Sequence, residues 1–194
     1  RIFSCAPYQD CHEAEGGVGV ISMLFASSLV ALVGNGERAD DSPRRLRLFN
    51  TSTQAVVFEL TFASDVLALK MNKRRLVVVL ASTTHIFELS TMKMLQTLDT
   101  APNPRGLGAL SISAETSICA VWPSGGAPNW QGKLVVYDAA HGHPVSTVAA
   151  HHSGICCVAL SHRGELMATA SVKGTVVRVH QLPSGDCLHV FRRG

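Results

Sequence analysis

The feature that most constrains the fold is a unit of four short strand-forming segments that recurs along the chain. These segments are rich in Val, Ile, Leu and Thr and are bounded by Gly, Asn, Ser or Pro, which is typical of β-strands joined by turns. The most regular copy consists of residues 154–162, 165–171, 175–182 and 187–191. Further copies occupy residues 66–98 and 106–148, and residues 19–60 fit the unit more loosely. Since no long helical period interrupts the units, the sequence predicts an all-β fold.

Four strands recurring about every 40–50 residues match the spacing of WD40-type propeller blades. Side chains alternate along a strand, so a single four-stranded sheet exposes two apolar faces, and stacking neighbouring blades buries both. A β-sandwich, the alternative, explains the strands but not their recurrence. No Trp-Asp pair ends any unit, so a divergent WD40-like propeller of about four blades is predicted.

Composition limits the classes of ligand. The net charge of +3 is too small for binding nucleic acid or membranes by bulk charge, so any anion site must be local. Six cysteines without C-x-x-C spacing favour a reducing compartment, with the sulfurs inside the core. Residues 16–36 carry no charge and are long enough to span a bilayer, but we interpret them as strands 20–25 and 29–33 with a turn at 26–28.

The last unit contains the most specific motifs: Ala149-Ala-His-His-Ser-Gly, Thr169-Ala-Ser-Val-Lys-Gly-Thr and Phe191-Arg-Arg-Gly194. Together with residues 24–33 and 103–111, they resemble the PROPPIN (WIPI) family of phosphoinositide-binding β-propellers of autophagy. The resemblance covers nearly the whole chain and implies a seven-bladed ring, of which this chain is expected to be a fragment. It assigns residues 1–7 to the last strand of blade one, 18–62 to blade two, 63–100 to blade three, 104–149 to blade four and 150–194 to blade five.

The resemblance also implies two headgroup sites. In the first, Arg178 and Arg192 would bind phosphate oxygens through the paired, coplanar N–H donors of their guanidinium groups. The other residues that it implies for this site are His151, Thr169, Ser171, Lys173, Gly174 and Thr175. Arg193 would begin the second site, whose remaining ligands are expected in blade six, beyond this sequence. Consecutive side chains of an extended backbone point to opposite sides, so Arg192 and Arg193 are not expected to share one pocket.

Each of these features has a plainer interpretation. Paired arginines at a strand end are commonly solvated, residues 169–175 would form a hairpin turn in any case, and His151 would cap a strand. Residues 141–143 and 151–152 hold pairs of histidines, which we interpret as loop and strand residues, because no carboxylate or cysteine stands at metal-ligand spacing. No metal or cofactor is expected. The charged loop at residues 37–45 is interpreted as solvated, with a partner contact as the alternative.

The expected function is therefore binding, not catalysis, because no nucleophile elbow or metalloprotease motif occurs. The resemblance implies an effector that reads phosphatidylinositol 3-phosphate and the 3,5-bisphosphate and acts as a scaffold in autophagosome formation. It implies a cytoplasmic protein held peripherally on phagophore, endosomal and vacuolar membranes. Autophagy proteins of the lipid-transfer or conjugation machinery would bind through blades two and three, and no nucleic-acid partner is expected. The alternative is a WD-repeat interaction scaffold without lipid binding.

Overall fold

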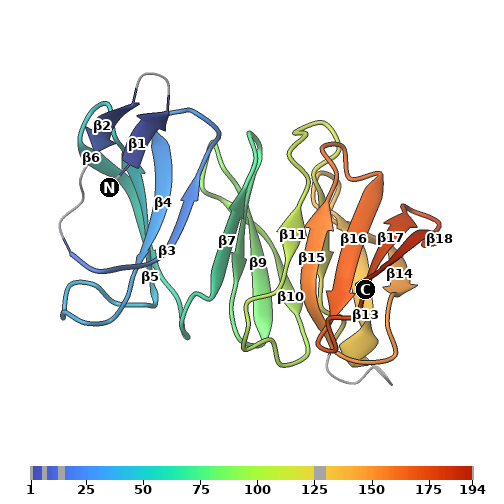
Figure 1. Ribbon diagram of the computed structural model, residues 1–194. Helices are drawn as coiled ribbons and strands as arrows, with labels where there is room; N and C mark the ends of the chain where they lie inside the picture. Colours follow the sequence, from blue (N-terminus) through green and yellow to red (C-terminus); the bar gives the residue numbers. More distant parts are fainter. Residues whose placement is uncertain (1, 6–7, 13–15, 125–129, 194) are drawn as a thin grey trace. The chain divides into compact units, whose positions relative to one another are not determined.

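The computed structural model describes residues 2–5, 8–12, 16–124 and 130–193. The chain divides into two compact units, Arg1–Val66 and Leu67–Gly194, and each is considered by itself. Figure 1 shows that both units are built from strands. Parts of two predicted features lie outside the described residues: the ends of the segment 1–7, and Gly194 of the Phe-Arg-Arg-Gly motif.

The first unit contains two sheets. A two-stranded antiparallel sheet consists of β1 (Ile2–Cys5) and β2 (Tyr8–His12), and the sequence did not predict β2. A four-stranded sheet consists of β3 (Val18–Met23), β4 (Leu29–Gly34), β5 (Arg45–Asn50) and β6 (Ala55–Thr61), paired in chain order. The uncharged segment thus folds as two strands, with Ser27 N donating to Leu24 O in the turn (3.1 Å). No helix in the described ranges is both long and apolar enough to cross a membrane.

The loop between β4 and β5 is more than a solvated connection, which corrects the prediction for residues 37–45. Asp41 is buried, and its Oδ2 accepts a hydrogen bond from Gly17 N at 2.9 Å. Arg47 Nη2 lies 3.6 Å from the other carboxylate oxygen. A side chain at Gly34 would collide with the backbone of Asp41, so the loop folds back tightly over the end of β4. The loop is charged, as the sequence shows, but the charge pattern did not indicate that one of its aspartates, Asp41, is buried.

The second unit contains three four-stranded antiparallel sheets, each with its strands paired in chain order. The first sheet consists of β7 (Ala68–Met71), β8 (Arg75–Val79), β9 (Thr83–Glu88) and β10 (Met94–Asp99). The second consists of β11 (Ala109–Leu110), β12 (Ile118–Val121), β13 (Lys133–Asp138) and β14 (His143–Ala149), with the short 3-10 helix η1 (Trp130–Gly132) before β13. The third consists of β15 (Ile155–Leu160), β16 (Leu166–Ser171), β17 (Val176–Gln181) and β18 (Cys187–Arg192). With the sheet of the first unit, these confirm the predicted all-β architecture of four-stranded repeats.

Stacking of sheets buries both faces of the middle sheet of this unit, and β12 shows how. Cys119 and Val121 belong to an apolar cluster shared with Val77 and Val79 of the preceding sheet. Ala120 faces the other way, into a cluster that includes Met167 of the following sheet. Alternation along one strand therefore supplies apolar groups to two interfaces, which is the physical requirement for blades that stack.

The cysteines do not all serve as core atoms, which corrects another prediction. Cys119 is fully buried, and burial raises the pKa of its thiol to about 12. Cys157 and Cys187, in contrast, are exposed. They lie in β15 and β18, and β18 is the outer strand of the third sheet, so no further strand of the described chain covers it.

Candidate functional site

The predicted site residues gather on one face of the third sheet of the second unit. Thr169 of β16 lies directly opposite Arg178 of β17 in the strand register. On the other side of β17, Val176 pairs with Arg192 of β18, and Arg178 pairs with Val190. Arg192 is therefore a diagonal neighbour of Arg178 on the same face, at a separation that long side chains bridge. The sequence prediction that these two arginines lie together agrees with this geometry.

His151 approaches the same face from the segment between β14 and β15. Its Nε2 lies 3.1 Å from the hydroxyl of Thr169, which is itself almost completely buried. The neighbouring residue, Ala150, accepts a hydrogen bond through its carbonyl oxygen from Nη1 of Arg178. This segment thus fixes both an imidazole and a guanidinium, and the second contact was not foreseen from the sequence.

The turn between β16 and β17 closes one end of this face. Gly174 N donates to Ser171 O at 2.8 Å, and Gly174 adopts a left-handed conformation with φ of +66°, which favours glycine. Thr175 O accepts from Arg193 N at 3.0 Å, so the β17–β18 ladder continues one residue past β18. The expectation of a hairpin turn agrees with this segment, and the turn also presents Lys173 and Thr175 to solvent.

Accessibility divides the predicted ligands into three groups. Thr169 and Ser171 are buried, at 1% and 5% exposure, so their hydroxyls support the site from beneath. Arg178 and His151 are half-buried. The remaining predicted residues are exposed: Lys173, Gly174, Thr175, Arg192 and Arg193. A ligand arriving from solvent would meet the exposed cations first and the half-buried pair afterwards.

The basic residues predicted as ligands lack acidic partners in the described part of the chain. Among the described residues, Lys173, Arg178, Arg192 and Arg193 form no ion pair; the arginines that do are Arg45 and Arg47, in the first unit. Uncompensated guanidinium groups on one face create a local positive potential in a chain of low net charge. Such a face is suited to a multiply charged anion, for which the guanidinium offers paired donors.

The surroundings of His151 disfavour the protonated form of its ring. Burial lowers the pKa of His151 from its ordinary value, and the nearby charge of Arg178 acts in the same direction, although hydrogen bonding at Thr169 opposes them. A phosphate bound beside His151 would favour the protonated ring, so ligand binding and proton uptake are expected to be coupled.

Arg193 is separated from the first site by strand geometry. Because the ladder extends through its backbone, its side chain is expected on the face opposite to Arg192. Phe191, two residues earlier, is 58% exposed on that face. The two arginines are therefore not expected to converge on one ligand within this sheet, and the division into two headgroup sites stays a prediction.

The remaining histidines do not build a metal centre in the parts of the chain that the structure covers, where no three His, Cys, Asp or Glu side chains cluster. One carboxylate was overlooked in the sequence argument: Oδ2 of Asp138 lies 2.7 Å from Nδ1 of His141. Sequence reasoning also missed Gly132, which packs against the backbone of His151. Its carbonyl accepts from Ala150 N and His151 N at 2.9 and 3.1 Å.

Comparison with known proteins gives a consistent picture. The family model described as PROPPIN matches residues 9–194. Autophagy-related protein 18b of Arabidopsis thaliana is 42% identical over 195 residues, which cover 100% of this chain and 52% of that protein. Autophagy-related protein 18 of Yarrowia lipolytica is 38% identical over 212 residues, which cover 100% of this chain and 53% of that protein. The chain spans about half the length of these curated relatives.

Solved structures agree in fold. The complex of KlAtg21 with the coiled coil of AgAtg16 matches 99% of this chain and 64% of the other chain, with a TM-score of 0.85 and 31% identity. Kluyveromyces lactis Hsv2 matches 99% of this chain and 57% of its own, with a TM-score of 0.76 and 18% identity, which supports the fold alone. The prediction of a β-propeller fold is confirmed by these likenesses.

Proposed function

Because this chain belongs to the PROPPIN family, we propose that it binds phosphoinositide headgroups and acts as a peripheral membrane scaffold in autophagosome formation. The observation that supports this most strongly is the placement of Arg178 and Arg192 on one face of the third sheet, without an acidic partner among the described residues. His151 stands beside them, and its ring gains a proton more readily once an anion is bound.

The proposed ligands are phosphatidylinositol 3-phosphate and the 3,5-bisphosphate. Phosphate oxygens match the fork of a guanidinium, which gives directional bonds beyond simple charge attraction. Basic residues near an anionic membrane contribute only about 1 kcal/mol each, so one site alone holds the protein weakly. Arg193, on the opposite face, belongs to a second headgroup site, and simultaneous occupation of both sites raises the avidity.

The proposal extends to partners and location. The protein would act on phagophore, endosomal and vacuolar membranes and recruit autophagy proteins of the lipid-transfer or conjugation machinery. The related KlAtg21 is known in complex with the coiled coil of AgAtg16, which supports recruitment of a protein partner by this fold. We assign that contact to residues 18–100, blades two and three of the resemblance. No reaction is catalysed: the protein's role is to connect a lipid with a partner.

The test is sedimentation with liposomes that contain phosphatidylinositol 3-phosphate. Arg192→Ala combined with Arg193→Ala is expected to abolish binding. The matched control is Arg163→Ala, because Arg163 is an exposed arginine in the turn between β15 and β16, away from the Ser171–Thr175 turn. Circular dichroism of each variant verifies folding. Undiminished binding by the double variant would refute the site and favour a protein-interaction scaffold without lipid binding.

A further inference from the structure

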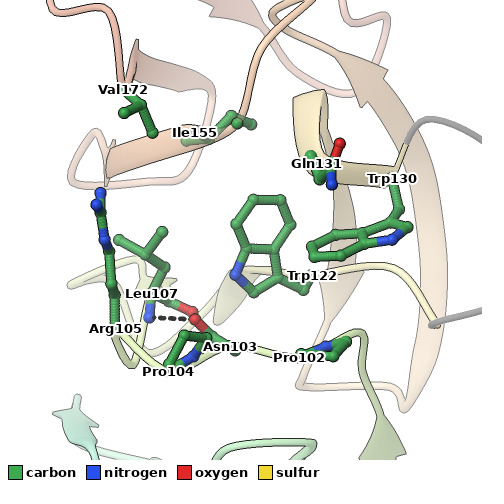
Figure 2. A pocket seen from close by; sticks show the side chains of 11 residues that line it. Pro102, Asn103, Pro104, Arg105, Leu107, Trp122, Trp130, Gln131, Ile155 and Val172 are labelled. Carbon is green, nitrogen blue, oxygen red and sulfur yellow. Dashed lines mark hydrogen bonds between the residues drawn. The ribbon is translucent and has the colours of Figure 1, made fainter.

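A pocket lies between the last two sheets of the second unit, and none of its lining residues is assigned to a headgroup site. It is an open pocket with a volume of about 150 Å³. One wall is the loop between β10 and β11, the floor and far side carry Trp122 and Trp130, and the third sheet contributes Gly154, Ile155 and Val172. Figure 2 shows these side chains around a common space. This volume is below the range of about 300–1,000 Å³ that is usual for small-molecule pockets, so the pocket suits a single side chain better than a large cofactor.

The loop that forms one wall is held rigidly. Asn103 is buried, its Nδ2 donates to Leu107 O at 2.8 Å, and its Oδ1 accepts from Leu107 N at 2.9 Å. Gly106 within this loop has a φ of +61°, and a side chain there would collide with Leu67. Both ends of the Asn103 amide are thus used inside the loop, so the wall is preformed and needs no ordering when a ligand binds.

The two tryptophans form an aromatic corner. Their rings are 5.3 Å apart at 86°, an edge-to-face arrangement that holds both in place. Trp122 is 5% exposed, and its indole N–H has no hydrogen-bond partner among the described residues. In Figure 2 this nitrogen is turned toward Asn103 and Leu107, on the side where the loop borders the pocket. Since buried indole N–H groups usually find an acceptor, this one is available to a ligand carbonyl or carboxylate.

The charge carried by the described lining residues is positive only. Arg105 is the single charged residue among the described residues that line the pocket, and it forms no ion pair within that part of the chain. Its side chain extends along the edge of the pocket toward Val172 (Figure 2). The lining therefore offers a cation and an unpaired N–H donor beside an apolar corner, and it contains no carboxylate.

We propose that this pocket binds a short linear segment of a partner protein in which a bulky apolar side chain stands next to an acidic residue. The apolar side chain packs between Trp130, Ile155 and Val172. The acidic side chain pairs with Arg105, and a carbonyl of the segment accepts from Trp122 Nε1 after a small displacement of the groups that bury this nitrogen. Aromatic-lined grooves with one indole donor are a recurrent means of recognising extended peptides.

The test uses a display library of random linear peptides of about twelve residues, selected on the full chain. Selection against the Arg105→Glu variant removes peptides that bind elsewhere. The expected survivors contain Asp or Glu beside Leu, Ile, Met, Phe or Trp. The sequence has two tryptophans, both in this pocket, so the intrinsic fluorescence of the chain reports occupation directly.

Affinities of the selected peptides then test each part of the assignment. We expect Arg105→Glu and Trp130→Ala each to weaken binding by about tenfold or more, and Arg105→Lys to retain most of it. Arg163→Glu, the same charge reversal at a distant exposed arginine, should change nothing. Survivors without an acidic residue, or no Arg105-dependent survivor at all, would overturn the proposal. So would a loss of liposome binding in Arg105→Glu without any peptide binding, because the pocket would then belong to the membrane contact.

Discussion

Arg178 lies directly opposite Thr169 across the β16–β17 ladder, and this pairing sets the geometry of the whole candidate headgroup site. The buried hydroxyl of Thr169 contacts His151, and the guanidinium of Arg178 reaches the carbonyl of Ala150. The pair Thr169 and Arg178 thus connects one face of the third sheet to residues 150–151, which precede that sheet. Arg192, diagonal to Arg178 on the outer strand, remains free to meet a ligand.

The same-face placement of Arg178 and Arg192 implies that their contributions to lipid binding are coupled. We expect Arg178→Lys and Arg192→Lys each to weaken binding to liposomes containing phosphatidylinositol 3-phosphate by about tenfold. The compact ammonium group of lysine cannot replace the paired, coplanar N–H donors of a guanidinium. The double variant should lose less than the product of the two single effects, since both side chains hold one headgroup. When Arg193→Lys is combined with Arg178→Lys, the loss of affinity should equal the product of the two single losses. Equal coupling in both pairs would contradict the division into two sites.

His151 implies a defined pH dependence. Burial lowers the pKa of His151 below the ordinary value of 6.5 in the free protein, and a bound phosphate raises it again. Affinity should therefore be nearly flat above the pKa of His151 in the complex and increase as the pH falls below that pKa, because the complex takes up a proton that the free protein lacks. The measurement is liposome affinity between about pH 8 and about pH 5.5.

The lipid phosphate also titrates in this range, so the informative quantity is the difference between the wild type and His151→Gln at each pH. The variant should match the wild type at the alkaline end and fall behind at the acid end. Parallel curves over the whole range would remove the imidazole from the headgroup contact.

Strand alternation made much of the fold readable from the sequence. Residues 165–171 and 175–182 were predicted as strands and are β16 and β17 within one residue at each end, because both have a clear two-residue period bounded by turn formers. The copy at residues 106–148 was predicted to begin with a strand at Gly106, yet only Ala109–Leu110 pair as a strand there. There Gly106 belongs to a turn in which its backbone N–H donates to Asn103 O. Gly106 also lies so close to Leu67 that a side chain would not fit. A contact with a residue so distant in the sequence cannot be read from the local pattern.

The candidate site was predictable to the extent that a motif names its residues. The resemblance identified Arg178 and His151, and strand register then explains why they meet. It could not indicate that Thr169 is buried beneath the site, or that Gly132 supports His151, because these are contacts between neighbouring sheets. Glycines that permit close approach carry no chemical signature in a single sequence.

Gly132 is expected to control the position of His151. A methyl group at Gly132 would lie on top of the carbonyl oxygen of His151, whereas one at Gly174 would meet nothing and would suffer only from the left-handed backbone. Gly174→Ala should therefore cost about 1 kcal/mol of folding stability. Gly132→Ala should cost more than about 2 kcal/mol, because the obstructing atom is backbone, and should also weaken lipid binding at temperatures where the chain stays folded. Urea unfolding and liposome sedimentation measure the two effects, and equal costs would contradict the packing.

Arg75 provides a test of how the first two sheets of the second unit are joined. It is buried, and its Nε and Nη2 donate to the carbonyls of Ala139 and Ala140 at 2.6 and 3.1 Å. Arg75→Met keeps much of the apolar stem but leaves both acceptors unsatisfied, so unfolding in urea should show a loss of about 2–4 kcal/mol. Arg74→Met, at the exposed neighbouring arginine, should change stability by no more than about 0.5 kcal/mol. If the two variants were equally stable, the carbonyls would not depend on Arg75, and contact between apolar side chains alone would join the sheets.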